Sequence, residues 1–258
     1  MNRNNPHRRL SWLSKLALLL LVMTSLSAAA NDVEGVTSDP WEGFNRKIFV
    51  FNDYGDRYFL RPIAQGYHYV LPDPVESGIS NVFSNASMVI TMVNDVLQLK
   101  FDELGHDSSR FLINTTLGLL GVFDVASSVG LHHRDEDFGQ TLGYYGVPTG
   151  PYLVLPFLGS STVRDGLSRF PDSYVSPVSN IDHVPTRNEL HGLNIISSRA
   201  GVLNVDQLVS GDRYVFIRDA YLQHREWLVQ DGNVTDDFGD EDYDEFDDID
   251  DLESVLEL

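Results

Sequence analysis

The sequence predicts an all-α fold in which long Gly/Pro-rich loops join amphipathic helices. Apolar side chains recur at spacings of three and four along several segments, which is the periodicity of a helix with one apolar face. Three of these segments open with helix-start signals, and no segment shows sustained period-two alternation or an internal repeat. The 258 residues are enough to bury a sizeable core in one large domain or two small ones.

The first two helices begin with the same pattern, Asp-Pro-x-Glu. Asp39 is expected to cap the first helix, with Pro40 in its first turn and Glu42 reaching back. The second helix starts at Asp73 and is expected to break at the polar residues 84–87, before a new apolar stretch over 88–99. The apolar stripe of the first helix consists of Phe44, Ile48, Phe51, Tyr54 and Tyr58.

Residues 110–131 are apolar around most of a helical circumference. Gly118 and Gly121 would let another helix approach closely, and Asp124 interrupts the apolar run. A helix that is apolar all round belongs either in a protein core or in lipid. The composition of this segment favours a buried core helix.

Gly and Pro recur so densely between residues 131 and 161 that no regular helix is expected there. A connection of about 30 residues is far longer than a usual loop, which indicates a functional role. The apolar run 152–157 is too short to assign as a strand. A short helix is expected at 164–170, and a Pro-punctuated loop follows it. A capping box at 186–189 then opens another helix, and the last helix is expected over 212–229.

The chain carries a formal net charge of −20, and the acidic residues concentrate at its end. Residues 231–258 hold 14 of the 38 carboxylates and no Lys or Arg, so this tail is expected to be disordered because its carboxylates repel one another. Residues 31–230 form the expected helical domain. An acidic chain lacks the basic face that binds phosphates, which argues against nucleic acid as a partner.

Residues 1–30 have the pattern of a secretory signal peptide. Arg3, Arg8, Arg9 and Lys15 form a basic region, residues 16–23 are an unbroken apolar run, and Ala28 to Ala30 supply small residues for cleavage before Asn31. The alternative is a short transmembrane anchor, but spanning a bilayer takes about 20 apolar residues. We therefore expect an exported protein.

The sequence offers no support for catalysis, a metal or a cofactor. It has no cysteine, no G-x-S-x-G elbow and no Gly-rich phosphate loop with Lys. Ser108 and Ser109 follow His106 and Asp107, but neighbours in sequence do not make a catalytic triad. The run 132–137 contains two histidines and is expected to be a solvated loop, and the D-x-D-x-D pattern at 240–244 lacks the Gly of a calcium loop.

Five motifs, in order, resemble the MlaA (VacJ) family of the Gram-negative outer membrane. They are DPWEGFNR at 39–46, RFLINTTLG at 110–118, FGQTLGYYGV at 138–147, GPYLVLPF at 150–157 and RYVFIRDAYLQ at 213–223. The resemblance implies a ring of helices within the bilayer around an amphipathic channel. It also implies removal of mislocalised phospholipids from the outer leaflet, association with a porin trimer, and delivery to a periplasmic carrier like MlaC.

The resemblance also suggests which residues line or gate such a channel. The aromatic stripe of the first helix would meet lipid tails or neighbouring helices, and the Gly/Pro-rich loop at about 138–148 would form a mobile hairpin beside the channel. For the polar members of this set, the alternative is that they cap or bridge helices. The expected residues are Phe51, Asn52, Asn114, Thr115, Thr116, Phe138, Gly139, Gln140, Gly143, Tyr144, Tyr145 and Gly146.

The chain departs from the family in one respect that bears on attachment. Family members end their signal with a cysteine that is acylated, and this sequence contains no cysteine. Membrane attachment would then come from the ring helices or from a porin. The alternative function is a soluble periplasmic lipid-binding or scaffold protein that lost embedding together with the anchor.

Overall fold

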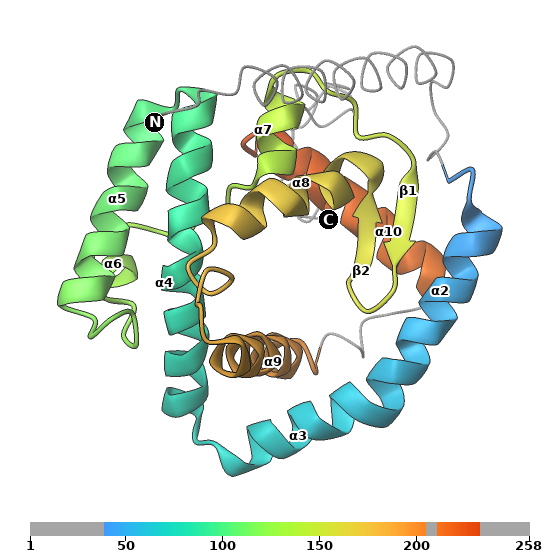
Figure 1. The fold of residues 1–258 in the computed structure, drawn as a ribbon, viewed down its shortest axis with the longest axis horizontal. Helices are drawn as coiled ribbons and strands as arrows, with labels where there is room; N and C mark the ends of the chain where they lie inside the picture. Colours follow the sequence, from blue (N-terminus) through green and yellow to red (C-terminus); the bar gives the residue numbers. More distant parts are fainter. Residues whose placement is uncertain (1–38, 205–210, 233–258) are drawn as a thin grey trace, which may run out of the picture.

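The computed structural model describes residues 39–204 and 211–232, and these form a ring (Figure 1). Helices make up almost all of the described secondary structure, so the predicted all-α class is confirmed; a two-stranded sheet is the one addition within the described ranges. The expected signal peptide and most of the acidic tail lie outside these residues. In chain order the elements are α2 (Glu42–Gly55), η1 (Asp56–Leu60), α3 (Arg61–Val70), α4 (Asp73–Gln98), α5 (Phe101–Thr116), α6 (Val125–Ser128), α7 (Phe138–Tyr144), β1 (Tyr152–Leu155), β2 (Gly159–Thr162), α8 (Val163–Val175), α9 (Val184–Gly201) and α10 (Arg213–Val229).

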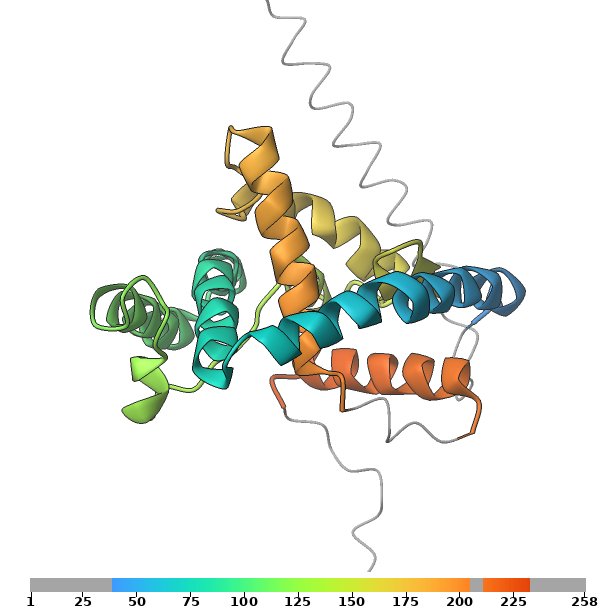
Figure 2. The same ribbon diagram turned by 90° about the horizontal axis from the view of Figure 1, so that it is seen from below.

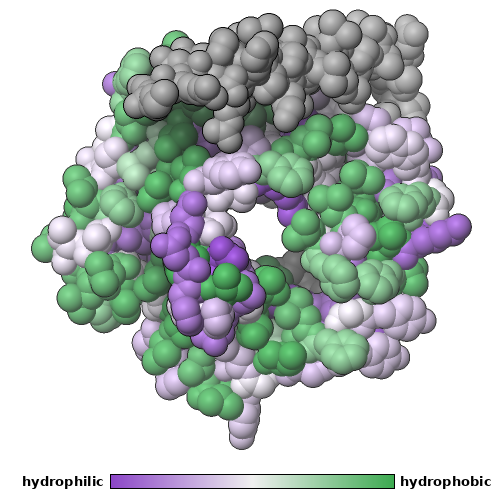
Figure 3. Space-filling model, in the orientation of Figure 1, coloured by the Kyte–Doolittle hydropathy of each residue, from purple (hydrophilic) through white to green (hydrophobic). Residues whose placement is uncertain are grey.

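The ring is built from one curved helical arm and a set of shorter elements that close it. The arm runs through α2, η1 and α3, and α4 follows it around the ring (Figure 1). Seen from the side, α9 stands across the ring and extends well beyond it, while α10 lies along the opposite face (Figure 2). A space-filling view shows an open hole through the centre (Figure 3). The expected ring-like bundle is therefore confirmed.

The arm stays continuous because a π-helical segment, η1, bridges its two α-helices. Pro62 has no N–H to donate, and the wider hydrogen-bond spacing of the π segment lies immediately before it. The expected cap at Asp39 is wrong: Trp41 occupies the N-cap position and no side chain caps α2. Asp39 instead accepts hydrogen bonds from Asn45 Nδ2 (2.8 Å) and from the Tyr214 hydroxyl, and so ties the start of the arm to α10.

The expected break in the second helix is also wrong, because α4 is unbroken from Asp73 to Gln98. Its polar residues do not end the helix; they face the interior of the protein. Asn85 is buried and donates to Thr115 Oγ1 at 3.0 Å, which joins α4 to α5. Val93, Val96 and other apolar residues of α4 are exposed.

Residues 110–131 do not form a buried core helix. α5 ends at Thr116, a turn follows, and Leu119 and Leu120 adopt the left-handed conformation with φ values of 53° and 59°. A Cβ at Gly118 would lie 2.2 Å from the Phe123 carbonyl oxygen, so the turn requires glycine there. Leu119, Leu120 and Phe123 are exposed, which contradicts the expected burial.

The Gly/Pro-rich region 131–161 contains regular structure, although its Gly and Pro content predicted none. α7 begins at Phe138, with Asp137 as its N-cap accepting from the Gln140 amide at 2.8 Å. β1 and β2 then form an antiparallel hairpin in which Tyr152 pairs with Thr162 and Leu155 with Gly159. The run 152–157 therefore does contain a strand, and short local turns around the glycines separate these elements.

The last three helices were located correctly, and α8 and α9 have shifted ends. α8 continues through Pro171 to Val175, beyond the expected end at 170. α9 begins two residues before Thr186, and the imidazole of His183 caps it instead of the expected capping box. α10 begins where predicted, with the Asp212 carboxylate accepting from the Tyr214 amide at 2.9 Å.

Candidate functional site

The described residues have an inverted distribution of polarity. Seven apolar residues are buried, compared with nineteen polar or charged ones, while large apolar side chains are exposed on nearly every helix. Green apolar atoms cover much of the surface in Figure 3. A water-soluble protein of this size buries its apolar side chains and rarely exposes contiguous apolar patches. The exterior of this ring is therefore suited to contact with lipid or with an apolar protein surface.

The hole in the ring is the most distinctive feature of the structure (Figure 3). The arm α2–α3, the helices α4, α8 and α9, and the β-hairpin lie around it (Figure 1). No helix of the described part of the chain is both long enough and apolar enough to cross a bilayer.

Two asparagines on α2 fix the β-hairpin at the edge of the hole. Asn45 donates to the carbonyl of Tyr152 at 3.0 Å and accepts from the amide of Val154 at 2.9 Å. Asn52 is two turns further on; it donates to the carbonyl of Leu155 at 2.9 Å and accepts from the amide of Phe157 at 2.8 Å. These two side-chain amides replace a neighbouring strand along the open edge of β1.

The side chain of Arg225 holds three elements together. It binds the Asp137 carboxylate at the start of α7 through two contacts of 2.6 and 3.0 Å, and the Asp165 carboxylate of α8 through two contacts of 3.0 Å. The Tyr221 hydroxyl also donates to Asp165 at 3.0 Å. Burial would raise the pKa of Asp165, but the guanidinium groups of Arg225 and Arg164 lower it below its usual value.

The glycines expected to make a mobile gate serve close packing at two of three positions. A Cβ at Gly139 would lie 2.6 Å from Asp165 Oδ1, and one at Gly143 would lie 2.8 Å from Arg164 Nη1. Of the three, Gly146, at φ +81°, has open space around it. The region expected to be a hairpin is therefore a helix, α7, packed against the Arg225 cluster and followed by a turn, and its movement as a gate stays a prediction.

Three of the expected lining residues lie on α5, where Asn114 and Thr115 bridge to neighbouring elements and Thr116 bonds within the helix. Asn114 donates to Asp124 at 2.9 Å and accepts from the Ala126 amide, Thr115 accepts from Asn85, and Thr116 donates to its own helix. α5 lies on the outer side of α4, away from the hole (Figure 1). Asn114 and Thr115 stabilise the contact among α4, α5 and α6, which was the alternative that the sequence left open.

Three of the four aromatic members of the expected set, Phe51, Tyr144 and Tyr145, are exposed, and Phe138 is half-buried. Phe51 packs edge-to-face on Phe157 at the hairpin tip, with ring centroids 5.1 Å apart. Tyr144 and Tyr145 form a similar pair at 5.3 Å, and the Tyr145 hydroxyl donates to the Leu97 carbonyl at 2.6 Å. The amide of Phe138 donates to the Asp172 carboxylate, which connects α7 to α8. A lipid contact by these rings stays a prediction.

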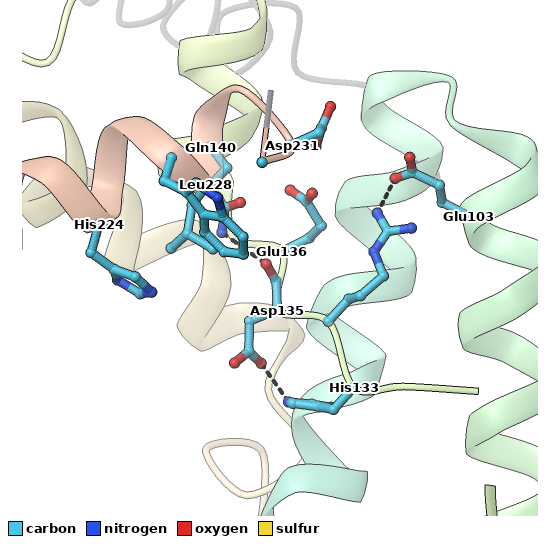
Figure 4. Close-up of a pocket in the computed structure, with 11 residues that line it drawn as sticks. Glu103, His133, Asp135, Glu136, Gln140, His224, Leu228 and Asp231 are labelled. Carbon is cyan, nitrogen blue, oxygen red and sulfur yellow. Dashed lines mark hydrogen bonds and ion pairs between the residues drawn. The ribbon is translucent and has the colours of Figure 1, made fainter. Parts of the chain in front are cut away.

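A cavity of about 470 Å³ lies on the α10 side of the ring, between the end of α10 and residues 133–136 (Figure 4). Glu103, Glu136 and Asp231 bring carboxylate oxygens within 4.8 Å of one another there. Lys100 neutralises part of this cluster, with Nζ at 2.5 Å from Asp231 and 3.4 Å from Glu136. A metal ion would have to displace that lysine, so the cluster does not indicate a metal centre.

The histidine-containing run 132–137 contributes residues to the same cavity. His133 Nε2 lies 2.9 Å from Asp135, and Arg134 binds the Glu103 carboxylate (Figure 4). Sequence reasoning did not identify Lys100, Glu136 or Arg225 as members of a cluster, because their partners lie far away in the chain. The spacing of Asn45 and Asn52 could have indicated that they act together. The two residues are seven apart, which is two helical turns, and both lie on the polar side of α2.

Comparison with known proteins gives a consistent result. Residues 37–227 match the family described as "MlaA lipoprotein". The chain is 37% identical over 229 residues to the "Intermembrane phospholipid transport system lipoprotein MlaA" of Escherichia coli, which covers 86% of this chain and 90% of the relative. An uncharacterized protein of Rickettsia bellii is 42% identical over 196 residues, covering 74% of this chain and 77% of the relative.

A solved structure shares both the fold and the sequence. It is described as "Structural basis for maintenance of bacterial outer membrane lipid asymmetry" and aligns with a TM-score of 0.66 at 37% identity, covering 74% of this chain and 99% of that one. The order of the motifs, the ring and these similarities agree, and the chain belongs to the MlaA lipoprotein family.

Proposed function

We propose that this protein transports phospholipids between membranes and removes those that reach the outer leaflet of the outer membrane. The observation that carries this proposal is the combination of an apolar exterior with an open hole through the ring (Figure 3). The names of the relatives support it, because the curated ones with a described role belong to an intermembrane phospholipid transport system.

The physical role of the ring is to lower the cost of moving a lipid out of its leaflet. Each CH₂ group that leaves the hydrocarbon for water costs about 0.8 kcal/mol, so a free diacyl lipid is strongly retained. A ring embedded in one leaflet lets the headgroup pass through a hydrated hole while the acyl chains stay next to apolar surface. The barrier falls without any bond being made or broken, so the proposed function is not enzymatic.

We infer an outer-membrane location with the ring facing the periplasm. Residues 1–30 would direct export, and embedding of the exposed apolar side chains would replace the acylated cysteine that the sequence lacks. A porin trimer is the proposed membrane partner, and a soluble carrier like MlaC is the proposed acceptor of the lipid. The acidic tail would contact a basic patch on that carrier, and removal of residues 232–258 should then weaken carrier binding and its salt dependence.

Site-specific photocrosslinking in cells tests this function. A crosslinker at Phe51 or Tyr144, both half-exposed aromatic positions, should yield phospholipid adducts. A crosslinker at Glu189, an exposed polar position on α9, serves as the control for random lipid contact. Absence of phospholipid adducts from Phe51 and Tyr144 would contradict the proposal.

Fractionation separates the proposal from its alternative. A soluble periplasmic lipid-binding or scaffold protein would appear in the periplasmic supernatant and would leave membranes completely on a carbonate wash. The embedded ring should stay in the outer-membrane pellet. Release of fatty acid from labelled phospholipid by the purified protein would instead indicate a hydrolase.

A further inference from the structure

We propose that the contact between α7 and α8 is a pH-sensitive latch, in which ionisation of Asp172 loosens the hold of α8 on the start of α7. α8 lies beside the hole, and α7 packs directly against it (Figure 1). The region of α7 is the one that the sequence predicted as a gate. The latch is a property of the fold, and its effect on lipid passage rests on the proposed transport function.

Both oxygens of the Asp172 carboxylate face the first amide of α7. The Phe138 amide donates to Oδ1 at 3.1 Å and to Oδ2 at 3.2 Å, and Asn94 of α4 donates to Oδ1 through Nδ2 at 3.4 Å. Phe138 directly follows Asp137, the N-cap residue of α7. Two carboxylates therefore lie at the same end of this helix, one from its own chain segment and one from α8.

The carboxylates at this junction outnumber the cations. Three carboxylates gather beside two guanidinium groups, namely Asp137, Asp165 and Asp172 beside Arg164 and Arg225. The four contacts of Arg225 go to Asp137 and Asp165, and Arg164 pairs with Asp165 at 3.1 Å. Both cations are therefore engaged by the other two carboxylates, and an ionised Asp172 adds one negative charge in excess.

The other groups around Asp172 do not offset this charge. The Asn94 amide of α4 is neutral, and the two strands that pack on α8 contain no Asp, Glu, His, Lys or Arg. Arg169, on the preceding turn of α8, is exposed to solvent. Burial, with the nearby Asp137 carboxylate, raises the pKa of Asp172 to about 6, although the bonds from Phe138 and Asn94 favour its charged form.

The raised pKa determines the direction of the switch. If α7 moves away from α8, Asp172 becomes exposed to water and regains its ordinary pKa of about 4. The pKa is therefore higher in the docked state, so docking of α7 takes up a proton and weakens as the pH rises through 6. Between pH 5 and pH 7 the ratio of undocked to docked α7 should rise about tenfold.

Amide hydrogen exchange of the full chain in detergent measures this ratio, once the rates are corrected for the intrinsic pH dependence of exchange. The amides of residues 141–145 report on α7, and those of α9 report on a helix outside the latch. We expect the protection of the α7 amides to fall between pH 5 and pH 7 about tenfold further in the unmodified protein than in Asp172→Asn. The same difference at the α9 amides would mean that Asp172 acts on unfolding of the whole ring, and would overturn the latch.

Asp172→Asn keeps the shape of the side chain and an oxygen that can accept from the Phe138 amide, but it cannot ionise. Asp182→Asn, at an exposed position after α8, is the matched control and should keep the pH response of the unmodified protein. Asp172→Ser also lacks a titratable group and needs less room, so it replaces the amide variant if that variant does not fold. An equal pH response with and without the Asp172 carboxylate would overturn the proposal.

Transfer of labelled phospholipid from vesicles that contain the protein to a soluble carrier like MlaC measures the consequence for passage. Transfer should be faster at pH 7 than at pH 5 in the unmodified protein, and Asp172→Asn should reduce this difference. If exchange changes as expected but transfer does not, α7 is a latch without control of the passage, and the regulatory role is wrong. Absence of transfer at every pH would contradict the proposed function, while exchange would still test the latch.

Discussion

The two asparagines of α2 allow the clearest test of how the ring is held together. Replacing Asn45 by Ala removes its bonds to the Tyr152 carbonyl and the Val154 amide, and Asn45 is completely buried. Each buried backbone group left without a partner costs about 1–3 kcal/mol, so the expected loss of unfolding free energy for the two groups is about 2–6 kcal/mol. The bond to Asp39 is lost as well.

Asn52→Ala should cost less, although it also removes two hydrogen bonds. Asn52 is only half-buried and contacts the hairpin near its exposed tip, where water can reach the freed Leu155 carbonyl and Phe157 amide. The net value of a solvent-replaceable hydrogen bond is about 0.5–1.5 kcal/mol, which gives about 1–3 kcal/mol in total.

Chemical denaturation in detergent measures these losses, and amide hydrogen exchange locates them. Exchange should accelerate at the amide of Val154 in Asn45→Ala and at the amide of Phe157 in Asn52→Ala. Asn194→Ala, at an exposed position of α9, is the control and should change neither. If Asn45→Ala were no more destabilising than Asn194→Ala, the asparagines would not fix the hairpin and the reasoning would fail.

Three further predictions concern Arg225, Asp95 and Gly139. Arg225→Lys cannot bind Asp137 and Asp165 with paired contacts, so the unfolding free energy should fall by about 3–5 kcal/mol; an unchanged denaturation midpoint would contradict this. Burial, with the nearby Asp107 and Glu136 carboxylates, raises the pKa of Asp95 to about 7, so the folded state loses stability as the pH rises through 7. Asp95→Asn should therefore gain stability relative to the unmodified protein as the pH rises from 5 to 8, by about 3 kcal/mol, because about two pH units separate pH 5 from the raised pKa. An equal difference in unfolding free energy at pH 5 and pH 8 would exclude this. Gly139→Ala should lower the melting temperature through the contact with Asp165, whereas Gly146→Ala would be strained only by its positive φ; equal effects would contradict the packing role of Gly139.

The sequence predicted well those features that depend on local chemistry. The start of α10 at Asp212 and the periodicity of the aromatic stripe in α2 need only neighbouring residues. The resemblance of five motifs predicted the ring.

The failures share one physical cause, which is that polarity is reversed in this fold. Apolar segments were expected in the core and polar residues at helix breaks, yet Asn85 lies buried within an unbroken α4 and Leu120 is exposed in a turn. The hydrophobic effect drives apolar side chains into the core of a protein in water, but this driving force is absent where the surroundings are apolar.

The site was predicted less well because its contacts are distant in sequence. Arg225 binds partners 60 and 88 residues away, and no periodicity within α10 identifies them. Local sequence patterns also could not predict the hydrogen bonds between β1 and two asparagines that lie more than 100 residues earlier in the chain.

Accessibility of single spin labels in reconstituted membranes is the most direct test of the central claim. The chain has no cysteine, so one can be introduced at Tyr69, at Leu117 or at the polar position Glu189. Labels at the two exposed apolar positions should be accessible to oxygen and shielded from a water-soluble nickel complex, while the label at Glu189 should show the reverse. Equal accessibility of all three labels to the nickel complex would mean that water surrounds the ring, and the account of an embedded lipid passage would be wrong.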